Sequence, residues 1–129
     1  MNKILKIMLL TLLFPSATSA QGTGALYQGL LPTLPPNQEV VIQEITLPPG
    51  RVGSAHRHDA YVWVYVVEGA VDMQVRGGEV TRVNAGEVFV ESPDDIHTMS
   101  NNPSSTEPAK FLAILIKEAG VPVVLPAER

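Results

Sequence analysis

From residue 39 onward, the chain is a series of short runs of β-branched and aromatic residues, and apolar residues do not recur in them with a helical period. In the first run, residues 39–47, side chains alternate between two faces, and the sequence Pro48-Pro49-Gly50 ends the run as a turn. Similar runs follow at residues 61–67, 71–75, 79–83, 87–91, 96–100 and 111–116. Turn-forming residues separate them, so the pattern predicts an all-β barrel or sandwich.

Residues 61–67 are apolar at every position, which is typical of a strand that is buried on both faces. Strand alternation turns one set of side chains toward the interior: Val62, Val64 and Val66. The aromatic side chains between them then form an outward stripe that is too large to be left in water. The N-terminal arm, residues 121–125 or a second subunit are the candidate covers, and packing against other strands of the same sandwich is the alternative. We expect a homodimer.

The N-terminal 20 residues have the composition of a secretory signal peptide. Lys3 and Lys6 precede an apolar run at residues 7–14, and Thr18-Ser19-Ala20 offers small residues for cleavage. The run is too short to span a bilayer, which needs about 20 apolar residues. We therefore predict an exported protein, periplasmic or extracellular, in which residues 21–38 form an irregular arm and residues 39–129 form one barrel domain.

Charge and cysteine content narrow the choice of partners. The whole chain has a net charge of −4, and removal of a signal peptide with two lysines leaves seven basic and thirteen acidic residues. This acidic balance argues against nucleic acid or an anionic membrane as the partner of the mature chain. The chain has no cysteine, so we expect a packed core, a partner subunit or a bound metal to stabilise the fold.

The three histidines of the chain are its strongest chemical signal. His56 and His58 are two positions apart, so in an extended chain both imidazoles leave the same face. His97 follows after several further strands and turns. Imidazole binds zinc, iron, copper and nickel, and a pair plus a distant third histidine is a ligand spacing that these metals can use. Surface or hydrogen-bonded core histidines are the alternative.

At these positions the sequence resembles the cupin superfamily. Four residues are in register with the first cupin motif: Gly50, His56, His58 and Gly69. Three match the second motif: Gly86, His97 and Asn101. Ser92 and Asp94 stand where that motif has proline and glycine, so we expect a reshaped turn before His97. The resemblance covers roughly residues 39–116 and implies a double-stranded β-helix, or jelly roll, in which the three histidines bind a divalent transition metal such as Fe, Mn, Ni, Cu or Zn.

Val62 occupies the position of the glutamate in the first motif. Three neutral imidazoles leave the charge of a divalent ion uncompensated and several coordination positions open. The cupin thiol dioxygenases and some diketone-cleaving cupins are similar, because they also use three histidines. Glu91, at a strand end, is a tentative catalytic residue, as a fourth ligand or general base, and a solvated strand end is its alternative. Asp59 is turned away by strand alternation.

These features predict an exported metal-binding protein with a small-molecule substrate, an oxygen-dependent oxidase or dioxygenase. A non-catalytic module that binds a small ligand is the alternative from another functional class. A purely structural ion is a third interpretation.

Overall fold

The computed structural model describes residues 24–30 and 33–128. The predicted signal peptide, residues 1–20, lies outside the described residues, as does the start of the predicted arm. The described residues contain no helix that is long and apolar enough to cross a membrane.

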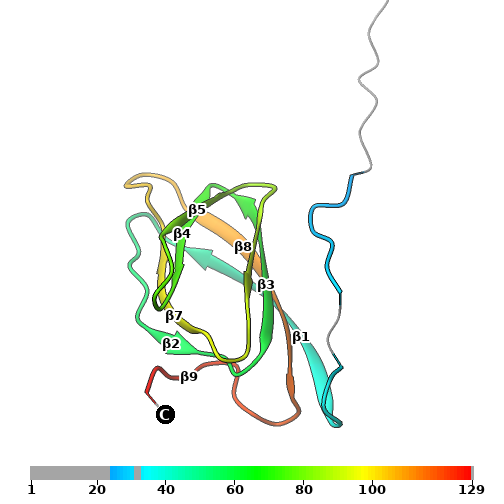
Figure 1. The fold of residues 1–129 in the computed structure, drawn as a ribbon. Coiled ribbons are helices and arrows are strands. Elements are labelled where there is room, and N and C mark those ends of the chain that lie inside the picture. Colours follow the sequence, from blue (N-terminus) through cyan, green and yellow to red (C-terminus); the bar gives the residue numbers. More distant parts are fainter. Residues whose placement is uncertain (1–23, 31–32, 129) are drawn as a thin grey trace, which may run out of the picture.

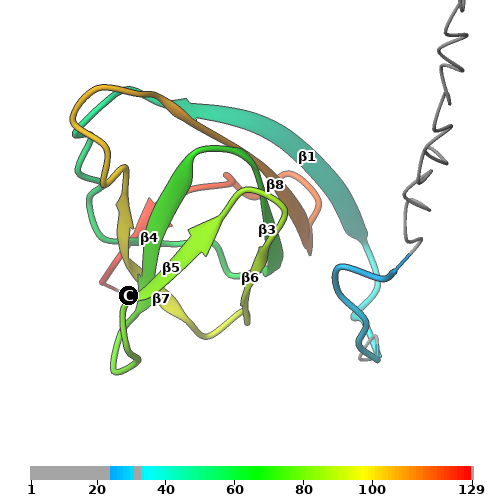
Figure 2. The same ribbon diagram turned by 90° about the horizontal axis from the view of Figure 1, so that it is seen from above.

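In the described part of the chain, antiparallel strands form two sheets that curve around a common interior (Figures 1 and 2). The four-stranded sheet has the order β1-β8-β3-β6, and the five-stranded sheet has the order β5-β4-β7-β2-β9. The strands are β1 Gln38–Leu47, β2 His56–Arg57, β3 Tyr61–Glu68, β4 Ala70–Val75, β5 Thr81–Asn84, β6 Val88–Glu91, β7 Ile96–Asn101, β8 Ala109–Glu118 and β9 Leu125–Pro126. The all-β prediction and its jelly-roll form are confirmed.

The core lies between the sheets and follows from strand alternation. Val62, Val64 and Val66 of β3 are buried, whereas the aromatic residues between them are partly exposed on the outside, as predicted. On the neighbouring strand β8, the odd-numbered residues face inward in the same way. Burial of these apolar side chains is the main stabilising contribution to a chain without disulfides.

The strand bounds differ from the prediction mainly around the histidine pair. β2 contains only His56–Arg57, and Asp59 has a positive φ of 48°, so the chain turns just after His58. The assumption of one extended strand through both histidines is therefore too simple. The strand predicted at residues 79–83 also shifts to Thr81–Asn84.

The C-terminal segment does not cover the outer aromatic stripe. Residues 121–125 were candidate covers for the outer aromatic stripe, but Leu125–Pro126 pairs with β2, and Val123 and Val124 line an interior pocket. The arm does reach the stripe, because the ring of Tyr27 packs edge-on against that of Trp63 with 6.2 Å between centroids. The arm therefore covers part of the outer face, and the C-terminal segment belongs to the inner one.

Candidate metal centre

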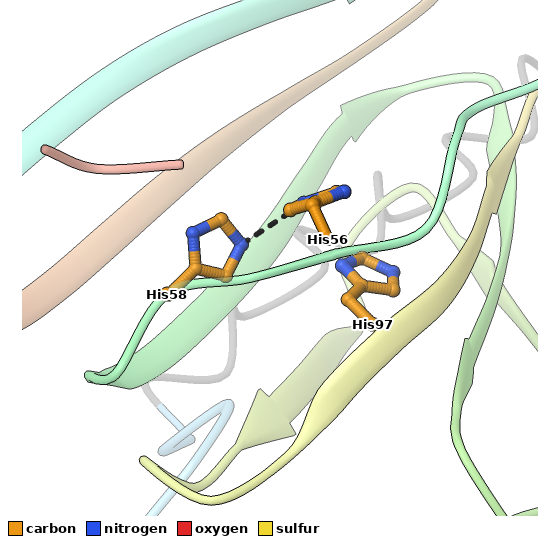
Figure 3. A group of neighbouring side chains, drawn as sticks. All are labelled: His56, His58 and His97. Carbon is orange, nitrogen blue, oxygen red and sulfur yellow. Dashed lines mark hydrogen bonds between the residues drawn. The ribbon is translucent and has the colours of Figure 1, made fainter. Parts of the chain in front are cut away.

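The three predicted ligands converge inside the barrel. His56 of β2 and His97 of β7 are direct cross-strand partners, so their side chains leave the same face of the five-stranded sheet. His58 follows two residues after His56 (Figure 3). One nitrogen from each ring lies within 4.8 Å of the other two, and together they form a group that could hold a metal ion. The structure thus brings together residues that are far apart in the sequence.

A β-bulge orients His97. The pairing of β4 with β7 changes register between Gln74 and Val75, which face Met99 and His97, so Thr98 is the extra residue. The hydroxyl of Thr98 donates to the main-chain oxygen of Gln74 at 3.1 Å and fixes the irregularity. In a regular strand, residues 97 and 100 would face opposite sides. Because of the bulge, His97 turns inward on the strand whose Ser100 also lines the interior pocket.

Main-chain carbonyls fix the tautomers of His56 and His58. Nδ1 of His56 lies 2.8 Å from the carbonyl oxygen of Ser54, and Nδ1 of His58 lies 2.6 Å from that of Val123. Because a carbonyl oxygen only accepts, each Nδ1 carries a proton and donates it. In the neutral rings, the free lone pairs are then on Nε2, and the two Nε2 atoms are only 3.2 Å apart. Such an approach needs a cation or a shared proton between them.

His97 and Glu91 form a buried polar pair beside the other two histidines. The residue is 4 % exposed, its ring stacks on Phe89, and neither ring nitrogen has a hydrogen-bond partner among the described residues. Oε1 of Glu91 lies 3.2 Å from Nδ1 of His97, but the pair lacks hydrogen-bond geometry, and Oε1 has no other partner there. Glu91 is 2 % exposed, so a solvated strand end is excluded. Buried polar atoms are nearly always paired, so a ligand or ion bound at this position would satisfy the ring nitrogens of His97 and Oε1 of Glu91.

Burial lowers the pKa of His58 below its ordinary value. The hydrogen bond with Val123 and the charge of Glu91 act in the opposite direction but are smaller effects. Burial therefore favours the neutral imidazole, the form that binds metals. Together with the converging lone pairs and the orphaned atoms of His97 and Glu91, this donor set fits a divalent transition metal.

A pocket of about 290 Å³ opens beside the histidines. His56, His58 and Glu91 contribute polar atoms to its lining, and the walls are mostly apolar: Ile45, Leu47, Val62, Val64, Phe111, Ala113, Leu115, Val123 and Val124. Arg51, Gln43, Ser54 and Ser100 add polar groups. Val62, which replaces the motif glutamate, is thus part of the apolar wall. The volume is near the lower limit of ligand pockets, which suits a small molecule.

Two asparagines hold the loop that carries Arg51. Asn101, the cupin-motif residue, accepts from the main-chain nitrogen of Gly53 at 3.0 Å. The buried side chain of Asn102 donates to the carbonyls of Leu47, Pro48 and Glu107. Asn102 was not singled out from the sequence. Its hydrogen bonds join the loop after β1 to the loop before β8, and these loops come together only in the folded chain.

Two other charged residues adjacent to the histidines bind each other. Arg57, between the two histidines, forms an ion pair with Asp59. Asp59 was predicted to turn away from the metal site, and neither Asp59 nor Arg57 lines the interior pocket beside the histidines. Neither residue belongs to the group of candidate ligands.

The fold and the site define a small double-stranded β-helix protein with a candidate three-histidine metal centre. The model of the cupin domain family matches residues 43–115, more than half of the chain, and the chain belongs to this family. No curated protein matches the chain.

Three solved structures illustrate the similarity of the fold to known proteins. An uncharacterised double-stranded β-helix protein from Klebsiella pneumoniae has 21% identity and a TM-score of 0.58, over 72% of this chain and 79% of that one. The DMSP lyase DddQ from Ruegeria pomeroyi has 14% identity and a TM-score of 0.57, over 64% of this chain and 41% of that one. An RmlC-like cupin from Methanocaldococcus jannaschii has 18% identity and a TM-score of 0.54, over 61% and 71%. At these low sequence identities, the similarity shows a shared fold and does not show a shared function.

Proposed function

We propose that this protein is a metal-dependent enzyme that oxidises a small organic molecule with dioxygen at a three-histidine centre. The observation that carries the proposal is the 3.2 Å approach of the Nε2 atoms of His56 and His58, both of which present lone pairs when neutral. His97 completes the set of ligands. When bound, a divalent transition metal supplies Lewis acidity and, if it is redox-active, a path for electrons from the substrate to dioxygen.

The pocket supports a substrate with an apolar body. Its walls are largely aliphatic, which excludes water and strengthens polar interactions near the histidines. Arg51 is the only basic side chain among the lining residues apart from the histidines, and it suits an anionic group of a bound molecule. We therefore propose a small, mainly apolar substrate with an oxygen or sulfur donor at one end and an acidic group at the other.

Oxygen uptake tests the reaction. The metal-free protein would be loaded separately with Fe²⁺, Mn²⁺, Ni²⁺ or Cu²⁺ and mixed with thiols, diketones and phenolic acids in an oxygen electrode. We expect at least one combination to consume dioxygen and to yield an oxygenated product, and the His56→Ala, His58→Ala double variant to be inactive. Metal-loaded protein that consumes no oxygen with any of these compounds would contradict the proposal.

The second candidate is a module that binds a small ligand without transforming it. Its support is the apolar pocket together with the absence of the motif glutamate at Val62. Under this alternative, a compound that stabilises the metal-loaded protein is recovered chemically unchanged. Mass spectrometry of the compound after prolonged incubation in air separates the two functions.

We also propose export and homodimer formation. The support for export is the composition of residues 1–20, and the test is the mass of the protein recovered from the periplasm or medium. The support for a dimer is the outer face of the four-stranded sheet, where a row of apolar cross-strand partners crosses every strand: Ile42, Ile114, Trp63 and Val90. With the apolar residues of the arm, this row forms an exposed patch of the kind that subunits bury.

A further inference from the structure

Glu91 and Val62 are direct cross-strand partners on β6 and β3. Residues paired in this way leave the same face of a sheet, and both line the interior pocket. Val62 occupies the position of the glutamate in the first cupin motif. The pocket therefore contains a carboxylate that stands on the adjacent strand, directly opposite the residue from which the motif carboxylate is missing.

The environment of Glu91 is unfavourable for an isolated charge. The residue is 2 % exposed, and its Oε1 has no hydrogen-bond partner among the described residues. The buried Lys117 does not compensate the charge of Glu91. Its Nζ instead binds Glu39 at 2.6 Å and the carbonyl of Glu118 at 2.8 Å. A buried carboxylate without a counter-ion is destabilising. Arg51 also lines the pocket, but it is exposed and donates to the carbonyl of Val52. A positive charge at the histidine cluster is therefore the buried compensation for Glu91.

The contact between Glu91 and His97 places an oxygen atom next to Nδ1 of the third histidine as well. Nδ1 of His56 and of His58 each has a carbonyl acceptor, whereas the atom 3.2 Å from Nδ1 of His97 is a carboxylate oxygen. A small rotation of either side chain would align this pair as a hydrogen bond. Carboxylate groups that accept from the second nitrogen of a ligand histidine fix its ring and strengthen its binding to metal.

From these observations we infer that Glu91 is the charge-compensating and positioning carboxylate of the metal centre. Glu91 supplies, from the neighbouring strand, the negative charge that the motif glutamate would have provided. It also orients His97 through Nδ1. This inference rests on the proposed metal centre but not on the proposed reaction. Glu91 would be a positioning residue, while the ligands remain the three histidines.

Binding of Co²⁺ tests the inference without any assay of activity. Wild-type protein, Glu91→Gln and the exposed control Glu44→Gln would be titrated with Co²⁺ against a competing chelator. We expect Glu91→Gln to bind about 10- to 100-fold more weakly, the usual effect of losing such a partner, and the control to be unchanged. X-ray absorption at the cobalt edge should give the same number of ligands in both proteins.

Two further measurements separate this role from a purely structural one. The metal-free Glu91→Gln protein should unfold at the same or a higher temperature than the metal-free wild type, because an uncompensated buried charge has been removed. The exchange Val62→Glu, Glu91→Val keeps the composition and returns the carboxylate to the motif position, so it should recover most of the affinity for Co²⁺.

The possible failures are distinguishable. Wild-type protein that binds no Co²⁺ would overturn the metal centre itself. Normal binding by the wild type with equal affinity in Glu91→Gln would overturn only the role of Glu91. One oxygen ligand fewer in the variant would show Glu91 to be a direct ligand and would overturn the positioning role. A metal-free variant that is clearly less stable than the wild type would show a structural role.

Discussion

The Nε2 atoms of His56 and His58 lie 3.2 Å apart while both Nδ1 atoms face main-chain carbonyls. We therefore expect protein purified without chelator to contain about one transition-metal ion per chain, and the His56→Ala, His58→Ala double variant to contain almost none. Elemental analysis measures this. The exposed substitution Glu79→Ala is the control and should keep its metal. Equal metal content in all three proteins would show that the ion binds elsewhere.

Removal of the metal should destabilise the fold. An ion that binds only the native state, present free at about 100 times its Kd, raises the free energy of unfolding by about 2.7 kcal/mol. Thermal unfolding before and after treatment with a chelator measures the change, and re-addition of metal should reverse it. A metal-free form as heat-stable as the loaded one, in protein that demonstrably binds metal, would contradict this expectation.

Asn102 should be important for stability, although it is not a candidate ligand. Its side chain is buried and connects three main-chain carbonyls and the nitrogen of Ser104. Asn102→Ala leaves these groups without a partner and should lower the free energy of unfolding by about 1 to 3 kcal/mol. Urea denaturation measures the loss. Asn84→Ala, at an exposed turn, is the matched control, and an equal loss in both would argue against a special role for Asn102.

The ion pair between Lys117 and Glu39 should make the stability of the fold decrease in acid. The hydrogen bond from Lys117, which is 2 % exposed, is the main cause of a Glu39 pKa below its ordinary value of 4.5. A carboxyl whose pKa is lowered on folding stabilises the protein above its unfolded pKa, and this contribution is lost as the pH falls through the folded pKa.

Glu39→Gln should therefore lower the melting temperature at neutral pH and flatten its decline in acid. Melting curves between about pH 3 and pH 7 show both effects. Glu44→Gln, an exposed glutamate on the same strand, is a suitable control. A decline in acid that is as steep in Glu39→Gln as in the wild type would assign the acid sensitivity to other groups.

Arg51 should select acidic ligands. Its side chain lines the pocket on a loop whose main-chain groups bind Pro48 and Asn102. Arg51→Gln should weaken binding of carboxylate-bearing ligands and leave both metal content and the binding of neutral analogues unchanged, since only the charge is lost. Isothermal titration with matched acid and amide ligands tests this. Equal weakening for both ligands would indicate a change of pocket shape.

The outer face of the four-stranded sheet should mediate dimer formation. Val40 and Ile42 of β1 are 63 % and 64 % exposed, and Ile42 belongs to the apolar row that ends at Val90. Ile42→Lys should shift sedimentation from dimer to monomer, because it places a charge in the proposed contact. Thr46→Lys, on the same face near the strand end, should have a smaller effect. A monomeric wild type would contradict the proposed interface.

The barrel was predicted from the local alternation of side chains, whereas the convergence of the histidines was predicted from their match to the two cupin motifs. Alternation in residues 61–67 correctly assigned the inward valines, and the spacing of His56, His58 and His97 located the candidate ligands. The burial of Glu91 was harder to predict. A strand end is exposed or buried according to what packs around it, and in this barrel Glu91 is buried at the interior pocket beside His97 of the opposite sheet.

The partners of the imidazoles were not predictable from residue types. Ser54 and Val123 contribute main-chain oxygens, which every residue has, so their side chains give no signal. Val123 also lies 65 positions after His58, and the segment 121–125 that contains it was one of several candidate covers for the outer aromatic stripe. Contacts of this kind depend on how loops close around the barrel, and a motif does not encode them.

The candidate centre draws on both halves of the molecule. The histidines belong to the five-stranded sheet or its connecting loop, whereas Glu91 belongs to the four-stranded sheet. In mechanical terms, a bound ion would hold His97 in place, and the contact of Glu91 with His97 would link the two sheets of a protein that has no disulfide. Pulling the sheets apart in a single-molecule experiment should therefore need more force when metal is present.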